Sequence, residues 1–189
     1  MAIWIFWNRF RFEARQDKGM EMANDIVDLP GFPCTTGWRI TGYYLPAETD
    51  FQDPAVPASV TEWGEDAFPA KFLDACRMEG WGETRYGWFL GWSGGHWVKS
   101  DFPKDARDGR LEIGCVAVDV HAIPLGTVLR IPTAPAPWCD RILTAADTGG
   151  GIKGKHIDIF CGFGNAARQE TYHVTAGNGT VCVSANTAL

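Results

Sequence analysis

The chain has 189 residues, of which 46% are hydrophobic and 21% charged, so it is long enough to bury one sizeable core. Its net charge is −6 and it has no run of Lys or Arg, which excludes the electrostatic footprint of a protein that binds phosphate backbones. We therefore expect no nucleic-acid partner. Nine tryptophans are many for this length, and their flat rings suit both a core and the apolar faces of sugars.

Residues 1–37 are predicted to form an N-terminal arm. Their apolar patch precedes Arg9 and Arg11, whereas a secretory signal peptide has its charges before a longer apolar run, so no signal peptide is recognised. No stretch approaches 18 apolar residues, so we expect no membrane span. If the target lies outside the cytoplasm, the chain would need another export route, such as a phage or a secretion system, or a leader that has been removed.

The next segment predicts one strand followed by a loop. WRITGYYL, residues 38–45, is rich in β-branched and aromatic residues and ends at Pro46, which is typical of a strand. Thr41 and Tyr43 should share one of its faces. Residues 46–66 are rich in Pro, Asp, Glu and Ser and predict a surface loop.

A short helix is predicted between Pro69 and Gly80, because apolar residues recur on one helical face of PAKFLDACRMEG. The Trp- and Gly-rich stretch 81–99 predicts a β-hairpin with its turn near Gly94-Gly95. Residues 100–110 are charged and predict a loop.

The last third predicts closely spaced strands joined by tight corners, one of them the triple glycine 149–151. No helical segment long enough for a βαβ crossover separates these strands. An all-β barrel is therefore favoured over a doubly wound sheet. The predicted strands cover residues 115–120, 127–132, 141–147, 155–160 and 173–184.

Six cysteines are widely spaced and form no CxxC pair, so a zinc site of the usual spacing is not indicated and we expect no metal. An even number permits up to three disulfides in an oxidising compartment. The sequence does not choose the pairing, and buried free thiols are equally compatible with it.

Two aspartates are the strongest candidates for chemistry. Asp147 closes one predicted strand and Asp158 lies inside the next, so a reversal through the triple glycine could bring their side chains within a few ångströms. A neighbouring like charge or an apolar wall would favour the acid form of Asp158. That form could act as the general acid that glycosidic bond cleavage needs.

Three further residues could support these aspartates. His156 shares a strand face with Asp158 and could bond the acid or a sugar, although a partly exposed histidine without a role fits equally well. Lys153 could hold an anionic or amide group, while a solvated lysine is the commoner outcome. Asp119 could cap a turn or join the site. By spacing alone, calcium loops and plain turns look similar.

Two long runs give a more specific indication. VAVDVHAIPLGTVLRIP and AADTGGGIKGKHIDIFCG resemble the three-Asp (3D) domain of the membrane-bound lytic transglycosylase A family, with Asp119, Asp147 and Asp158 in the same order and spacing. ITGYYLP (40–46) is similar to that family's F-T-G-Y-Y-x-P strand, and MEGWGETRYG (78–87) to its Q-G-S-G-x-x-x-x-G segment.

The chain departs from the family pattern at three positions. Val120 replaces a proline, Gly151 replaces an alanine, and Trp81 occupies a small position. These departures leave all three aspartates in place, so they bear on substrate geometry rather than on the candidate acid.

The resemblance implies a mainly β fold with a few short helices: a double-psi β-barrel over residues 38–189, with residues 48–110 as an inserted smaller lobe and the glycan in the groove between them. It implies that Asp158 is the single catalytic acid, that Asp147 supports it, and that Asp119 is more often structural. The substrate-binding residues expected from the matching segments are Thr41, Tyr43, Tyr44, Glu79, Thr148, Gly149 and Gly150.

The implied function is that of a peptidoglycan lytic transglycosylase, which cleaves the bond between N-acetylmuramic acid (MurNAc) and N-acetylglucosamine (GlcNAc) and leaves 1,6-anhydro ends, without a cofactor. It would act on glycan strands in the periplasm or cell wall, and an effector of this kind would need an inhibitor or immunity protein. Two alternatives stay open: an inverting glycoside hydrolase on the same barrel, and a non-catalytic, expansin-like wall-binding module.

Overall fold

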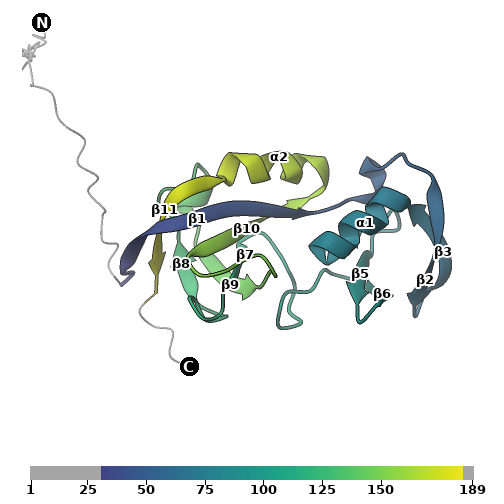
Figure 1. Ribbon diagram of the computed structural model, residues 1–189, viewed down its shortest axis with the longest axis horizontal. Coiled ribbons are helices and arrows are strands. Elements are labelled where there is room, and N and C mark those ends of the chain that lie inside the picture. Colours follow the sequence, from purple (N-terminus) through teal and green to yellow (C-terminus); the bar gives the residue numbers. More distant parts are fainter. Residues whose placement is uncertain (1–30, 185–189) are drawn as a thin grey trace, which may run out of the picture.

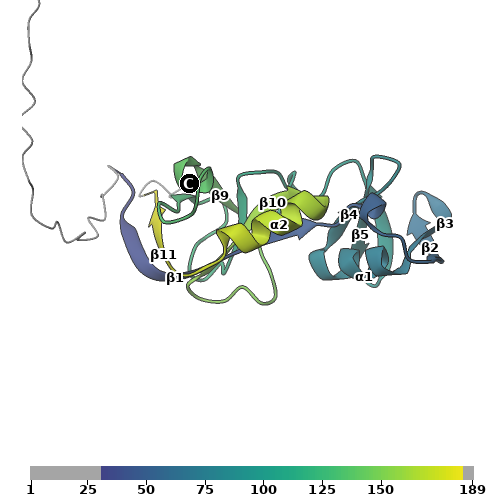
Figure 2. The ribbon, with the colours of Figure 1, turned by 90° about the horizontal axis from the view of Figure 1, so that it is seen from above.

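The computed structural model describes residues 31–184, which form two β-rich lobes arranged along the long axis of the molecule (Figures 1 and 2). One lobe is a closed barrel with the strand order β1-β10-β7-β9-β8-β11, and the other is a sheet with the order β3-β2-β6-β5-β4. The strands of the second sheet all fall between β1 and β7 in the sequence, so this lobe is an insertion into the barrel. The predicted mainly β barrel with an inserted lobe is confirmed.

Most predicted barrel strands are present with shifted ends. The barrel strands are β1 (Cys34–Leu45), β7 (Cys115–Val118), β8 (Val128–Arg130), β9 (Leu143–Asp147), β10 (His156–Phe163) and β11 (Ala176–Val183). β1 begins at Cys34 rather than at residue 38, because its first residues pair with β11. The predicted arm, residues 1–37, therefore overlaps the barrel at its end, and its residues 1–30 lie outside the described residues.

Alternation along the strands separates the barrel core from its outer face. Ile40 of β1 and Ile157 and Ile159 of β10 are buried in the core cluster, together with Val116 and Val118 of β7. The residues between them must point outward. Thr41 and Asp158 are such residues, and both are half-buried.

The second lobe contradicts one prediction. Residues 46–66 are not a loop throughout, because β2 (Ala55–Thr61) and β3 (Gly64–Pro69) pair antiparallel. Pro57 lies inside β2 without breaking it. β2 pairs with β6 only at Val60 and Thr61, so the half of β2 that contains Pro57 has a neighbouring strand, β3, on one side only and tolerates a residue without an N–H group.

The rest of this lobe follows the sequence pattern. Helix α1 (Ala70–Glu79) buries Phe72 and Cys76 and ends at Gly80, whose φ of 88° suits glycine. The hairpin is formed by β5 (Phe89–Ser93) and β6 (His96–Ser100), with β4 (Trp81–Glu83) on its edge. Among residues 31–184, neither α1 nor α2 has the length and apolar character that crossing a bilayer requires.

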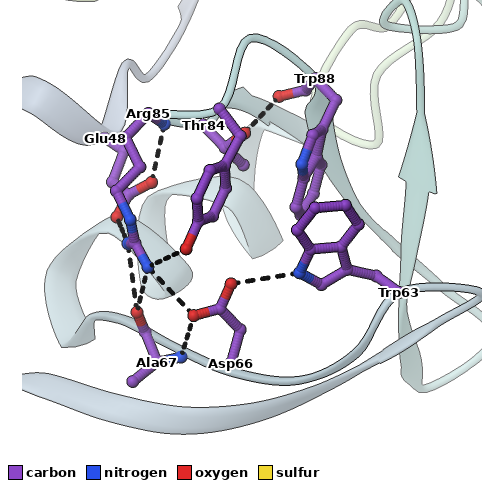
Figure 3. Close-up of polar contacts among 8 residues, drawn as sticks. Glu48, Trp63, Asp66, Ala67, Thr84, Arg85 and Trp88 are labelled. Carbon is purple, nitrogen blue, oxygen red and sulfur yellow. Dashed lines mark hydrogen bonds and ion pairs between the residues drawn. The ribbon is translucent and has the colours of Figure 1, made fainter.

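Arg85 ties the start of the inserted lobe to its sheet (Figure 3). Its backbone N–H donates to Glu48 at 2.9 Å, and its guanidinium pairs with Glu48 and, at 3.0 Å, with Asp66 of β3. Glu48 belongs to a short 3-10 helix, Glu48–Asp50, just after β1 and is buried. A carboxylate removed from water needs such a partner, so this pair fixes where the chain enters the second lobe.

Helix α2 (Gly164–Val174) was not predicted, and His173 and Val174, expected in a strand, belong to it. Its apolar stripe is sparse, since only Ala167 and Val174 among its larger apolar side chains are buried. The N–H of Asn165 donates to Asp50, 115 residues earlier, at 2.7 Å. This cap from a distant segment leaves no local sequence signal.

One disulfide, Cys34–Cys182, joins β1 to β11 at positions that are paired in the sheet, with a sequence separation of 148. The other four cysteines are free. Replacing both bridged cysteines by serine is expected to lower the free energy of unfolding by about 2–4 kcal/mol, because the unfolded chain regains the freedom that the crosslink removes. Urea denaturation measures this change. Cys139→Ser is the control, and an equal effect in both variants would contradict the expectation.

Candidate active site

The candidate site lies on the outer face of the barrel, on four strands in register. Thr41 pairs with Asp158, Asp158 pairs with Ala117, and Ala117 pairs with Asp147. β7 therefore lies between β9 and β10, so the two aspartates are two strand spacings apart, roughly 10 Å between Cα atoms. The glycine turn therefore does not connect neighbouring strands of the barrel, as the sequence interpretation assumed.

Asp158 is oriented by a short chain of hydrogen bonds. The hydroxyl of Thr41 donates to Asp158 Oδ1 at 2.6 Å, and His156 Nε2 lies 2.9 Å from the same hydroxyl oxygen. Because the single hydroxyl proton is used on Asp158, His156 must donate to Thr41. The predicted proximity of His156 and Asp158 on one strand face is thus realised through Thr41. Within residues 31–184 no hydrogen-bond partner occupies Oδ2 of Asp158.

Burial raises the pKa of Asp158 above its ordinary value. The Thr41 hydrogen bond and the charges of His156 and Arg39 act in the opposite direction, and the charge of Asp147 adds to the rise. The net effect favours a protonated carboxyl group. When Asp158 is in its acid form and Oδ1 accepts from Thr41, the proton lies on Oδ2, which is the oxygen left available to a ligand.

Asp147 is held differently, because both of its oxygens accept hydrogen bonds. Tyr43 donates its hydroxyl to Oδ2 at 2.9 Å and the N–H of Thr148 donates to Oδ1 at 2.8 Å. Burial raises its pKa, these two bonds lower it, and Asp105 raises it. Since neither oxygen is free, Asp147 is less suited than Asp158 to deliver a proton. Instead it anchors the ring of Tyr43, whose centroid lies 5.3 Å from the ring centroid of Phe160.

Asp119 accepts hydrogen bonds from two backbone groups. Its carboxylate accepts from the N–H groups of His121 at 3.0 Å and Gly154 at 2.7 Å. Both bonds lower the pKa of Asp119, and the bond from Gly154 has the larger effect. Asp119 thereby caps its own turn and holds the end of the glycine loop. Lys153, an exposed residue of that loop, lies near Asp119, and no contact joins it to Asp158.

The other residues expected to bind substrate are dispersed around these groups. Tyr44 points to the side of β1 opposite Tyr43, where Arg168 of α2 is near, so the structure does not bring it to Asp147. Glu79, at the end of α1, interacts with Asp158. Thr148, Gly149 and Gly150 begin the loop after Asp147, with Thr148 and Gly150 exposed.

Sequence reasoning missed two charged residues that act on the site. Arg39 lies two residues before Thr41 on the same strand face, so period-two alternation along β1 would have indicated it. Asp105 comes from the loop after β6 and acts on Asp147, and nothing in the local sequence reports that approach. Among residues 31–184, no three His, Cys, Asp or Glu side chains are placed to hold a metal ion.

Comparisons with known proteins bear on the domain and on the fold. Residues 114–182 match the family model of the 3D domain. The fold is similar to Escherichia coli MltA with bound chitohexaose (17% identity, TM-score 0.58, 77% of this chain and 71% of that chain). It is also similar to Neisseria gonorrhoeae MltA (14%, 0.57, 82% and 74%) and to the lytic transglycosylase LtgG of Burkholderia pseudomallei (17%, 0.52, 82% and 73%).

A comparison with curated protein sequences finds no significant match. The likeness to the solved structures is therefore one of fold, at identities of 14% to 17% in the three structures compared above. The matched residues contain Asp119, Asp147 and Asp158, the three aspartates described above. Residues 114–182 thus match the 3D domain, and the chain shares its fold with the MltA structures.

Proposed function

We propose that this protein is a peptidoglycan lytic transglycosylase in which Asp158 is the general acid. The observation that carries the proposal is the state of one carboxyl group. Asp158 is half-buried, its pKa is raised, Thr41 holds one of its oxygens, and the other oxygen has no partner within the described residues. A general acid requires this combination of retained proton, fixed direction and access.

In the proposed reaction, Asp158 protonates the oxygen that links MurNAc to GlcNAc. The bond to the muramic acid carbon then breaks with oxocarbenium character, and the carboxylate left behind takes the proton from the C6 hydroxyl of the same sugar. That oxygen closes the 1,6-anhydro ring. No water is consumed, so one carboxyl group can serve as acid and then as base. The charge-assisted bond from Thr41 stabilises the carboxylate between the two transfers.

Two observations support the substrate class and the compartment. E. coli MltA, whose fold the chain shares, was solved with bound chitohexaose, which supports a glycan as the ligand. The Cys34–Cys182 disulfide fits an oxidising compartment, as expected for a protein that acts in the periplasm or cell wall.

The test is incubation of the purified protein with sacculi, followed by mass spectrometry of the released fragments. Fragments with 1,6-anhydro ends are the expected product, and they are lighter than hydrolysis products by one water. Release of reducing ends instead would identify a hydrolase. Binding to sacculi without any release would identify a wall-binding module, and both results would overturn the proposal.

Thr41→Val is expected to lower the maximal rate of fragment release by about tenfold, because the carboxylate formed on Asp158 loses its hydrogen bond. That bond lowers the pKa of Asp158, so its removal raises this pKa further. The loss of activity with rising pH should therefore move to higher pH. Rates measured across a pH series check both effects, with the exposed Thr36→Val as control. An unchanged profile would show that Thr41 does not act on the acid.

A further inference from the structure

A pocket of about 380 Å³ lies between the second sheet and the loop that follows β6, and no step of the proposed reaction uses it. Its volume falls within the range of small-ligand pockets, roughly 300–1,000 Å³. On the side of the sheet it is lined by Trp81 of β4 and Val98 of β6, and on the side of the loop by Lys104, Asp105 and Asp108. The pocket therefore has one aromatic side and one charged side.

The aromatic side is fixed in place by its packing. The ring of Trp81 covers Gly91 of the neighbouring strand, since a Cβ at Gly91 would lie 2.5 to 2.8 Å from three of its ring carbons. Trp81 also packs against the buried cluster that contains Phe160 and Ala146, as does Tyr43. It stands where the similar family segment has a small residue, so this aromatic wall is a feature of the present chain.

The charged side is tied to the barrel through the backbone. The N–H of Ala106 donates to the carbonyl oxygen of Ala146, the residue before Asp147, at 3.2 Å. Asp105 Oδ1 accepts from two N–H groups of its own loop, at 2.7 and 2.8 Å, which fixes the shape of that loop. The pocket therefore adjoins the end of β9 that carries Asp147.

Charges of both signs are available there to a ligand. Among residues 31–184, the ammonium of Lys104 pairs with Asp108 alone, at 3.2 Å, and such an exposed pair is weak enough for a ligand to replace. Within the same residues, Oδ2 of the half-buried Asp105 makes no hydrogen bond. Lys99 also lines the pocket, but its ammonium lies over the ring of Trp63, 4.7 Å from the ring centroid. Lys104 and Asp105 are therefore the cation and the anion that remain for a ligand.

Such a pair of charges fits the peptide of peptidoglycan better than its sugars. The sugar backbone is uncharged, whereas the short peptide on each muramic acid carries carboxylates and, where it ends in a diamino acid, an ammonium. In the proposed reaction the peptide is attached to the sugar whose bond breaks, so it must lie close to Asp158. A charged pocket beside Asp147 is complementary to that peptide, and the ring of Trp81 can cover its apolar atoms.

We propose that this pocket binds the peptide of peptidoglycan, with Lys104 binding a carboxylate and Asp105 the ammonium of a terminal diamino acid. The inference rests on the proposed function for its substrate and adds a preference within it: glycan that carries peptides binds more tightly than glycan without them. Trp81 and the two charged residues determine specificity in this scheme, and none of them takes part in bond cleavage.

A binding experiment tests the pocket without any turnover. The indole N–H signal of Trp81, assigned with Trp81→Phe, is followed by ¹H–¹⁵N NMR as one of three ligands is added. The ligands are a muramoyl tripeptide that ends in a diamino acid, a muramoyl dipeptide without an ammonium, and chitohexaose. We expect the signal to shift with both muramoyl peptides and to stay in place with chitohexaose. An equal shift with chitohexaose would assign the pocket to a sugar ring and overturn the proposal, as would no shift with either peptide.

Two substitutions that each remove one charge test the roles of the side chains. Lys104→Gln is expected to weaken the binding of both muramoyl peptides by about fivefold, because both carry carboxylates. Asp105→Asn keeps an acceptor for the N–H groups of the loop and should weaken only the tripeptide, which alone carries an ammonium. Lys71→Gln, at an exposed position of α1, is the matched control and should bind both peptides as the wild type does. Unchanged binding of the tripeptide to Lys104→Gln would overturn the proposal.

The outcomes separate this pocket from the proposed function. If the tripeptide shifts the Trp81 signal but sacculi release no fragments, the proposed function fails and the peptide-binding pocket stands. If anhydro fragments are released but no muramoyl peptide shifts that signal, the pocket is refuted and the proposed function stands.

Discussion

Asp158→Asn is expected to reduce the release of anhydro fragments from sacculi by about a thousandfold or more, while the fold and glycan binding survive. The amide has the shape of the carboxyl group and its oxygen can accept the bond from Thr41, yet it has no acidic proton to give. General acid catalysis is worth roughly 10²–10⁴ in rate, and here the same group also serves as the base. Single-turnover assays with mass spectrometry of the products provide the measurement.

Asp147→Asn supplies the comparison for this result. Its two oxygens accept bonds from Tyr43 and from the N–H of Thr148, so an amide keeps one acceptor and disturbs the ring of Tyr43. We expect a smaller loss than for Asp158→Asn. If Asp147→Asn abolished release and Asp158→Asn did not, the roles assigned to the two aspartates would have to be exchanged.

Gly42→Ala is expected to destabilise the protein by about 3 kcal/mol, because the new methyl group has no room. A Cβ at this position would lie 2.6 Å from Val174 Cγ2 and 2.9 Å from the Cα of Thr171, so it would push against the backbone of α2. The close approach of β1 and α2 therefore depends on glycine. Urea denaturation measures the loss, with an expected fall in the midpoint.

The control for Gly42 is Gly177→Ala in β11, where a Cβ would meet nothing within 4 Å. It should change stability by less than about 1 kcal/mol. A similar effect of the two substitutions would show that a general cost of replacing glycine in a strand, rather than the contact between β1 and α2, explains the requirement at residue 42. Because Thr41 and Tyr43 flank this glycine, displacement of β1 should also slow fragment release.

The hydrophobic alternation of the strands was readable from the sequence because side chains on a strand alternate with period two. Ile157, Asp158 and Ile159 illustrate this: two apolar residues enter the core and the acid between them must face outward. The strand around Pro57 was missed, because proline and acidic residues are typical of a loop. Proline is tolerated there because β6 does not pair with this part of β2, which only the structure reveals. Helix α2 was missed because Asp50 caps it from 115 residues away.

The sequence by itself determined the class of fold, the order of the strands along the chain and the identity of the three aspartates, because these depend on local periodicity and on two long motifs. Only the tertiary structure decided how the aspartates differ. Strand order in the barrel put β7 between Asp147 and Asp158. Tyr43 donates to Asp147, whereas Thr41 donates to only one oxygen of Asp158 and the other has no partner among residues 31–184. The pKa of Asp158 likewise depends on the burial and the charges that folding places around it, and not on its position along the chain.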